Sequence, residues 1–396
     1  MAIRPVNVMF VITSMPVGGA ETLLVNLVRC MDRAQFNPSI CCLKEPGELG
    51  EQLSREFQVH SGLIRGKYDI GVLTRLRRLY LKNQIDAVIT VGAGDKMFWG
   101  RLAARFANVP VVLSALHSTG WPDGVGRLNR LLTPITDGFI AVAKQHGRHL
   151  AEVEKFPASK VFVIPNGIDT DRFVRNADSR TQWRSERGIS ADAPVVGIVA
   201  ALRPEKNHSR FLRIARRVAN QIPDAQFVIA GDGPERTKIE QQIEELSMNS
   251  NVHLLGTVSD IPAVLSMLDL FALTSDNEAS PVSIIEAMSC ELPVVAPRVG
   301  SISELVINDV TGIVVGADDE SEATTAWLRI LENRSIGTQW GRSARDRAVA
   351  SASLTAMTGG YCTLIHEILA KKNFTSTAPF PQFRNTVLAT GKSSSN

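Results

Sequence analysis

Two glutamates separated by seven other residues, Glu278 and Glu286, form the most specific chemical pattern in the chain. Glu278 lies in a polar loop after the apolar run 269-DLFALT-274, and Glu286 lies in a helix that starts near Pro281, because proline is favoured in a first helical turn. The loop carboxylate can accept sugar hydroxyls beside helix N–H groups that attract a phosphate. The alternative, a glutamate that merely faces a core, is poorly supported because an unpaired charge within 284-IIEAM-288 would be costly. The pair therefore suits a polyhydroxylated ligand that carries a diphosphate.

Two cations, Arg203 and Lys206, stand in 199-VAALRPEKNH-208, just past the end of an apolar strand pattern. Ligands of open α/β sheets bind at the carboxyl ends of the strands, and two cations at such a place suit a diphosphate. A solvated basic turn is the alternative. The position after a buried strand favours the binding interpretation.

Two adjacent glycines, Gly18 and Gly19, lie where the first strand pattern gives way to a helical one, in 13-TSMPVGGAE-21. Glycines let the backbone approach a ligand closely, and the N–H groups at the helix start can face a phosphate or a carboxylate. A plain strand-to-helix turn explains the loop equally well. The spacing is not GxGxxG, which argues against a Rossmann oxidoreductase. A further turn, 231-GDGP-234, is interpreted as a tight connection.

These motifs need a scaffold, and short apolar runs that alternate with amphipathic helical patterns provide it. Runs of this length suit strands that are buried on both faces of a parallel sheet. In the first half the predicted strands are 6–12, 85–91, 109–115, 137–143 and 160–164, and in the second half they are 195–201, 225–231, 252–256, 269–275, 292–296 and 313–316. The repeated alternation predicts an α/β protein with two Rossmann-like βα domains in tandem.

The boundary between the two domains is placed in the Asn-, Asp- and Arg-rich stretch 165-PNGIDTDRFVRNADSRTQW-183. We assign the first domain to residues 1–176 and the second to residues 177–370, whose last helix is a candidate to pack back on the first domain. Residues 374–396 show no periodicity and end in a serine run, so we expect them to form a disordered tail.

Composition excludes several classes of protein. Apolar residues make up 44% and charged residues 21% of the 396 residues, as in globular proteins. The longest apolar stretches fall short of the roughly 18 to 20 residues that cross a bilayer. Met1–Ile12 lacks the apolar region of a signal peptide, so the sequence predicts a cytoplasmic protein. Five cysteines form no CxxC pair, which disfavours disulfides and a zinc site. The net charge of +3 is too small to indicate nucleic-acid binding.

The chain resembles glycosyltransferase family 4, the group 1 retaining transferases of GT-B fold, over roughly residues 6–370. The motifs that carry the resemblance occur in the family's order and are 18-GGAE-21, 165-PNGID-169, 203-RPEKN-207, 231-GDGP-234 and the E-x7-E of Glu278 and Glu286. The resemblance implies a nucleotide-diphospho-sugar donor bound mainly by the C-terminal domain and an acceptor bound mainly by the N-terminal domain. It implies parallel sheets that face each other across a cleft, where the reaction takes place.

The same resemblance implies roles for residues of the N-terminal domain. Gly18 and Gly19 would lie against the donor diphosphate and the acceptor. His117, in 114-SALHSTG-120, matches a family histidine near the transferred sugar. Taken alone, this histidine would more often be a structural one.

In the C-terminal domain the resemblance implies that Lys206 holds the diphosphate, Glu278 the sugar hydroxyls and Glu286 the ribose. Ser280 and Val282, around the start of the same helix, are expected among the nucleotide-sugar contacts. The family commonly has an arginine where this chain has Ala201. Whether Arg203 supplies that charge is left open by the sequence.

The predicted activity is the transfer of a sugar, with retention, from a UDP- or GDP-sugar to a hydroxyl of a lipid-linked or saccharide acceptor in envelope or exopolysaccharide synthesis. No cofactor and no metal are expected, since no DxD motif or ligand cluster is evident in the sequence. An epimerase-like GT-B enzyme and a non-catalytic sugar-nucleotide-binding protein are the alternatives. A Rossmann oxidoreductase is disfavoured.

The pattern of 65-RGKYDIGVLTRLRRLYLKNQ-84 predicts a basic amphipathic helix. This stretch lies in the first half of the chain, which has a net positive charge. Such helices bind anionic membrane surfaces, so we expect peripheral contact with the inner face of a membrane. A helix packed on the core with a solvated basic side is an equally good interpretation.

Overall fold

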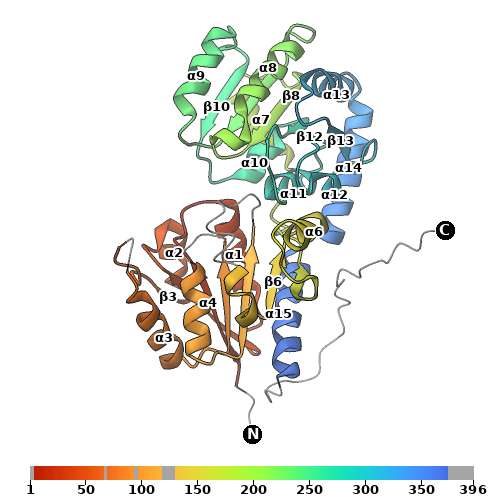
Figure 1. Cartoon of the computed structure of the whole chain (residues 1–396). Coiled ribbons are helices and arrows are strands. Elements are labelled where there is room, and N and C mark those ends of the chain that lie inside the picture. Colours follow the sequence, from red (N-terminus) through yellow and green to blue (C-terminus); the bar gives the residue numbers. More distant parts are fainter. Residues whose placement is uncertain (1–3, 67–68, 93–96, 118–129, 373–396) are drawn as a thin grey trace, which may run out of the picture. The chain divides into compact units, whose positions relative to one another are not determined.

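The computed structural model describes residues 4–66, 69–92, 97–117 and 130–372. It divides into two compact units (Figure 1). Unit 1 comprises the described residues up to Gly167 together with those from Leu354 onward, and unit 2 comprises Ile168–Ser353. The division falls before the predicted boundary at 176/177 because Ile168 and Phe173 are buried in the core of unit 2.

Unit 1 is built around a parallel sheet with strand order β3-β2-β1-β4-β5-β6-β7. Its strands are β1 (Val6–Ile12), β2 (Phe36–Cys42), β3 (Gln58–His60), β4 (Ala87–Val91), β5 (Val111–Leu116), β6 (Gly138–Ala141) and β7 (Val161–Val163). Its described α-helices are α1 (Gly19–Cys30), α2 (Gly47–Leu53), α3 (Val72–Lys82), α4 (Met97–Phe106), α6 (Lys144–Glu152) and α15 (Leu354–Lys371). Every strand predicted in the first half is present, whereas β2 and β3 were not predicted.

The amphipathic helix α3 packs with its apolar side on the core of unit 1. Val72, Leu76 and Tyr80 are fully buried in a cluster that also contains residues of β1, β4 and α4. The helix begins later than the predicted stretch 65–84, and Ile70, which precedes it, is 75% exposed. The structure therefore favours a core-packed helix with a solvated basic side.

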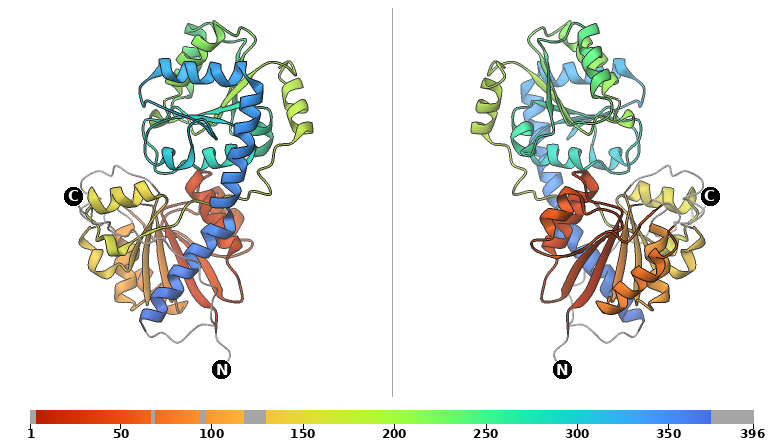
Figure 2. Two further views of the ribbon diagram at one scale, coloured as in Figure 1. Left: turned by 90° about the vertical axis from the view of Figure 1, so that its right-hand side faces the viewer. Right: turned by 90° about the vertical axis from the view of Figure 1, so that its left-hand side faces the viewer.

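The C-terminal helix α15 belongs to unit 1 although it follows all of unit 2 in the sequence. It contacts α1 and β5, and Figure 2 shows this dark-blue helix alongside the strands of unit 1. At its end, Lys372 Nζ donates to Asp137 Oδ1 at 2.6 Å and to the Pro110 carbonyl at 2.7 Å. The chain thus crosses between the units twice, once near Gly167 and once near Leu354.

Unit 2 contains a parallel sheet with strand order β10-β9-β8-β11-β12-β13. The strands are β8 (Val195–Val199), β9 (Gln226–Ala230), β10 (Val252–Gly256), β11 (Leu270–Ala272), β12 (Val294–Pro297) and β13 (Gly312–Val315). The α-helices are α7 (Ala177–Ser185), α8 (His208–Ala219), α9 (Arg236–Glu245), α10 (Ile261–Ser266), α11 (Val282–Ser289), α12 (Ile302–Leu305), α13 (Glu320–Glu332) and α14 (Arg334–Ser351). All six strands predicted in the second half are present.

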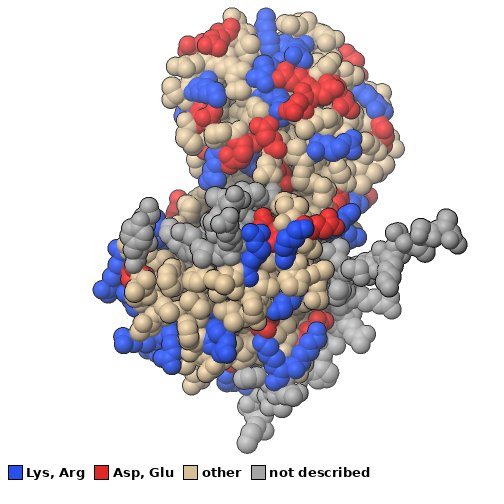
Figure 3. Space-filling model, viewed as in Figure 1, with Lys and Arg blue, Asp and Glu red and all other residues tan. Residues whose placement is uncertain are grey.

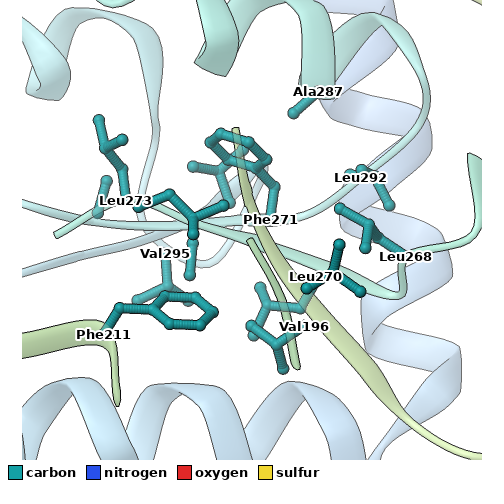
Figure 4. Packing of buried hydrophobic residues seen from close by; sticks show 14 of the residues in the cluster. Val196, Phe211, Leu268, Leu270, Phe271, Leu273, Ala287, Leu292 and Val295 are labelled. Atoms are coloured by element: carbon teal, nitrogen blue, oxygen red, sulfur yellow. The ribbon is translucent and has the colours of Figure 1, made fainter. Parts of the chain in front are cut away.

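The core of unit 2 forms because each central strand is apolar on both sides. Val196 of β8, Phe271 of β11 and Val295 of β12 are at most 1% exposed, and Phe211 reaches the same cluster from α8 (Figure 4). The Phe211 ring lies 5.2 Å from that of Trp327 on α13, measured between centroids. Full burial of such a side chain stabilises the fold by about 1.5 to 3 kcal/mol. This core fixes the loops at the carboxyl ends of β8 and β11.

Candidate active site

The loops after β8 and β11 meet at the point where the strand order of unit 2 changes direction. β8 pairs with β9 on one side and with β11 on the other, so the connections that leave β8 and β11 diverge. Such a switch point at the carboxyl ends of parallel strands is where ligands of open α/β sheets bind. The β8 loop carries Lys206, and the β11 loop carries Glu278.

Lys206 is held in place by the residue that follows it. Asn207 adopts the left-handed conformation, with φ 48°, and its side-chain oxygen accepts the N–H of Arg210 at 3.1 Å, which caps α8. The Thr274 hydroxyl, just after β11, donates to the carbonyl oxygens of Lys206 and Asn207, each at 3.1 Å. The lysine backbone is therefore anchored to β11 as well as to its own helix.

The side chains of Lys206 and Glu278 form an ion pair. Lys206 Nζ donates to Glu278 Oε1 at 2.6 Å, and the Ser275 hydroxyl donates to the same oxygen at 2.7 Å. Glu278 is only 8% exposed, so its charge is largely removed from water. Removing one partner of such a pair leaves a desolvated charge without compensation. The structure thus joins the two residues that the resemblance assigned to the diphosphate and the sugar.

The Glu278 loop is also clamped from the β12 side. Gly300 has φ +49°, and a Cβ at this position would lie 1.4 Å from the Glu278 carbonyl oxygen. Only glycine permits this approach of the two backbones. The loop after β12 therefore packs against the backbone of the Glu278 loop.

Glu286 lies on α11, the helix that follows the Glu278 loop. Its carboxyl group differs from that of Glu278 in its partners. Burial raises its pKa to about 7, while the nearby positive charge of Arg172 acts in the opposite direction. Among the described residues no hydrogen bond or ion pair engages its side chain. A carboxylate without a protein partner is suited to accept the paired hydroxyls of a ribose.

The start of α11 lies between the two glutamates. Its N-cap is Pro281, which gives no side-chain cap, so the first N–H groups of the helix are not satisfied by the cap residue. Ser280 and Val282 flank this proline. An uncapped helix start attracts phosphate and other anions, which agrees with the placement of these two residues among the expected nucleotide-sugar contacts.

Arg203 follows β8, three residues before Lys206, as its place in the sequence predicts. It lines a cavity of about 230 Å³ at the starts of α8 and α9, together with His208, Glu235 and Lys238. Its guanidinium makes no hydrogen bond or ion pair with any described residue. The structure therefore pairs Lys206 with Glu278, Arg203 lines the neighbouring cavity without a partner among the described residues, and Ala201 contributes no charge.

The candidate residues of unit 1 lie at the carboxyl ends of β1 and β5. Gly18 is the N-cap of α1 and gives it no side-chain cap, and Gly19 is the first residue of the helix. A Cβ on Gly18 would lie 2.4 Å from Glu21 Oε2. His117 follows β5, and burial lowers its pKa to about 4, so the imidazole is neutral near pH 7.

Several residues of this site were missed by the sequence analysis. Asn207 and Arg210 connect the loop after β8 to Asp276 and Thr274 after β11, and Ser275 bonds to Glu278 within the loop after β11. Their proximity depends on the pairing of β8 with β11, which local pattern does not reveal. Within the described residues, no group of three or more His, Cys, Asp or Glu side chains is arranged to hold a metal ion. None of the described helices has the length and apolar character needed to cross a membrane.

Two parallel-sheet βα units, with an ion pair and an uncapped helix start at the switch point of one of them, are typical of two-domain α/β proteins that bind phosphorylated ligands. Family models agree with this class: the Glycosyltransferase Family 4 model matches residues 17–172, and the model for glycosyl transferases group 1 matches residues 179–347. The chain belongs to the group 1 glycosyltransferases of family 4, and it is a transferase.

Two curated relatives are similar along most of their length. One is the UDP-Gal:alpha-D-GlcNAc-diphosphoundecaprenol alpha-1,3-galactosyltransferase of Escherichia coli, 26% identical over 350 residues, which cover 84% of this chain and 89% of that protein. The other is the GDP-mannose-dependent alpha-(1-6)-phosphatidylinositol monomannoside mannosyltransferase of Mycolicibacterium smegmatis, 28% identical over 291 residues, which cover 70% of this chain and 75% of that protein.

Among solved structures, HepE from Anabaena, crystallised with UDP and glucose, superposes with a TM-score of 0.81 at 21% identity. The match covers 91% of this chain and 99% of HepE. At this identity the likeness establishes the fold, which is GT-B as predicted.

Proposed function

We propose that this protein transfers a sugar, with retention of the anomeric configuration, from a nucleotide-diphospho-sugar to a hydroxyl of a lipid-linked or saccharide acceptor. The observation that carries the proposal is the pairing of Lys206 and Glu278 at the switch point of unit 2. A diphosphate needs a cation and a sugar needs hydrogen-bond acceptors, and both groups stand next to the start of α11. The alternative GT-B activities that the sequence left open lack a specific supporting observation.

The reaction needs stabilisation of the charge that develops on the leaving diphosphate as its bond to the anomeric carbon breaks. Lys206 is the group placed to supply it, with the uncapped N–H groups at the start of α11 as a second source. Preorganised charges of this kind contribute the largest single share of many rate enhancements. The leaving diphosphate would take the proton of the attacking hydroxyl on the same face of the sugar, which gives retention. No metal is part of this proposal.

Glu278 and Glu286 would act on different parts of the donor. Glu278, held by Lys206 and Ser275 through one oxygen, keeps its second oxygen for a hydroxyl of the transferred sugar. Glu286, whose side chain has no partner among the described residues, would take the ribose hydroxyls in its ionised form. Neutral His117 and the Gly18–Gly19 turn would orient the sugar and the acceptor.

The donor is expected to be a UDP- or GDP-sugar. The names of the two curated relatives specify UDP-galactose and GDP-mannose donors, and HepE was crystallised with UDP. A thermal-shift screen of UDP-, GDP- and ADP-sugars identifies the base, because a ligand at 100 times its Kd adds about 2.7 kcal/mol to stability. Release of free nucleotide diphosphate that depends on an added acceptor is the expected activity. Equal turnover without acceptor would contradict transfer.

We propose that the acceptor is lipid-linked and that unit 1 reaches it by peripheral contact with an anionic membrane. The names of both curated relatives specify lipid acceptors. The apolar face of α3 is buried, so contact would use its outer side and the end of α4. The exposed residues there are Arg77, Arg78, Leu81, Lys82, Arg105 and Phe106. Figure 3 shows Lys and Arg side chains on this part of unit 1.

A basic surface with two exposed apolar side chains matches the chemistry of an anionic bilayer interface. Co-sedimentation with vesicles that contain anionic lipid should weaken in a variant with Arg77→Glu and Arg78→Glu, and in high salt. Arg216→Glu, an exposed arginine of α8 in unit 2, is the control and should leave co-sedimentation unchanged. Binding that ignores lipid charge and salt would contradict this part of the proposal.

A further inference from the structure

Asp276 has no place in the mechanism proposed above, yet it lies between the two loops that carry the ion pair. Its backbone N–H donates to the Glu205 carbonyl at 2.8 Å. Its two carboxylate oxygens accept from Asn207 Nδ2 at 3.1 and 3.2 Å, and Arg210 Nη1 lies 2.9 Å from Oδ1. We infer that Asp276 is a positioning residue that holds Lys206 and Glu278 in register, an inference that rests on the proposed function.

The contacts of Asp276 bracket the catalytic lysine. Glu205 precedes Lys206 and Asn207 follows it, so Asp276 is bonded to the chain on both sides of that residue. Asp276 itself stands two residues before Glu278 in the other loop. A shift of one loop past the other would break the bonds on both sides of Lys206. The distance between Nζ of Lys206 and the Glu278 carboxylate is thereby fixed.

Asp276 also supports the unusual backbone of the lysine loop. Asn207 has a left-handed conformation, which a residue other than glycine seldom adopts without local hydrogen bonds. Its side-chain amide is engaged at both ends, because the oxygen caps α8 and the nitrogen bonds to Asp276. Loss of the carboxylate would free the nitrogen end and let the loop relax.

Arg210 provides a matched comparison within the same network. It is 9% exposed, and its guanidinium pairs with Asp276 through one nitrogen and with Asp318 of the loop after β13 through the other, at 2.6 Å. The Asp318 side chain is 90% exposed and makes no contact with the lysine loop among the described residues. Asp276→Asn and Asp318→Asn therefore each neutralise one partner of the same arginine, but only the first change touches the site.

Global stability should change little in either variant. The Asp276 side chain is 48% exposed, and ion pairs of partly exposed carboxylates contribute little to folding. A kinetic effect of Asp276→Asn can therefore be separated from unfolding. The melting temperature of each variant, measured beside its kinetics, checks this separation.

The experiment measures kcat, donor KM and melting temperature of the full chain with an accepted nucleotide-sugar. Asp276→Asn should lower kcat roughly 10- to 100-fold, since a small misplacement of reacting groups has effects of this order. Asp318→Asn should leave kcat within about twofold of the wild type, as surface charge changes usually do. In the Glu278→Gln background, Asp276→Asn should lower kcat by a clearly smaller factor, because it acts through the residue already lost.

Equal kcat values for Asp276→Asn and Asp318→Asn would overturn the inference. A double variant, Asp276→Asn with Glu278→Gln, whose loss of kcat equals the product of the two single losses would overturn it as well. A wild-type protein that turns over no nucleotide-sugar would instead overturn the proposed function. The two failures are distinguished by the wild-type assay alone.

Discussion

The carboxyl edges of the two sheets offer a ligand different kinds of groups. In unit 2 the loops after β8 and β11 hold opposite charges 2.6 Å apart, and Glu286 adds a carboxylate without a partner among the described residues. In unit 1 the candidate residues carry no charge: Gly18 and Gly19 present backbone, and His117 is neutral because burial lowers its pKa to about 4. In the proposed function this difference would give charge stabilisation to unit 2 and orientation to unit 1.

The two units also differ in how their candidate site residues are held in place. The charged residues of unit 2 are tied by side-chain hydrogen bonds from Ser275, Thr274 and Asn207. In the Gly18–Gly19 turn, the N-cap residue Gly18 gives α1 no side-chain cap. Preorganised charges need rigid support to act in the transition state. Substitutions in unit 2 should therefore have larger effects on kcat than substitutions in unit 1.

The largest effect is expected for Lys206→Met, which keeps the length of the side chain and removes its charge. The leaving diphosphate loses its main cation, so kcat should fall about 100- to 1,000-fold. The melting temperature should also fall, because Glu278 is left buried without its partner. Lys238→Met is the control, since Lys238 is exposed and pairs with Glu235. A Lys206→Met enzyme with wild-type kcat would show that unit 2 does not supply the charge.

A smaller effect is expected for His117→Gln in unit 1. The change keeps hydrogen-bonding capacity near the sugar but loses the imidazole geometry, so kcat should fall on the order of tenfold, which is less than the loss of roughly 100-fold or more expected for a missing general acid or base. A loss as large as that of Lys206→Met would break the distinction between charge in unit 2 and orientation in unit 1. Initial-rate kinetics for both variants, at the same donor concentrations, make this comparison.

His117 also predicts a pH dependence of stability. Its folded pKa of about 4 lies below the ordinary value of 6.5, so the unfolded chain binds more protons between these values. Stability should therefore fall as the pH decreases from about 6.5 towards 4. Because glutamine does not titrate, His117→Gln should flatten this part of a plot of melting temperature against pH. Parallel curves for variant and wild type would contradict the buried neutral state.

The smallest effect concerns Glu286, whose folded pKa of about 7 lies above its ordinary value of 4.5. The folded protein then binds more protons between these values, so this group makes stability decline as pH rises from about 4.5 to 7. Only the ionised form accepts two ribose hydroxyls, so donor KM should rise a few-fold as pH drops from 8 to 6, with little change in kcat. In Glu286→Gln the donor KM should be high and independent of pH over this range. A wild-type KM that is constant from pH 6 to 8 would argue against the ribose role.

Much of the fold can be predicted from local sequence, because strands that are buried on both faces consist of continuous apolar runs. The run at 6–12 and the runs around β8 and β9 could be located for this reason. β2 was missed because FNPSICC contains a proline and polar residues, and Pro38 precedes the three residues that pair with β3. β3 has only three residues, which is too short for a periodic signal.

The candidate site was only partly accessible to the same reasoning. Lys206 and Glu278 were found through motif and resemblance, but their mutual contact was not, because it depends on the pairing of β8 with β11. Asp276 and Asn207 gave no signal, since short polar residues in loops are ordinarily turn formers. The side chain of Arg203 lines the cavity at the starts of α8 and α9, and its role towards the diphosphate stays a prediction. Tertiary contacts decided each of these cases.

The most direct test of the account compares Glu278→Gln with Glu286→Gln in the same assay of kcat, donor KM and melting temperature. In the proposed function Glu278 would meet the transferred sugar as positive charge grows at the anomeric carbon, so its replacement should lower kcat about 100-fold. Glu286 would hold the ribose equally in ground and transition states, so its replacement should mainly raise donor KM. If Glu278→Gln retains full kcat while Glu286→Gln only lowers the melting temperature, the roles assigned to the two carboxylates are wrong.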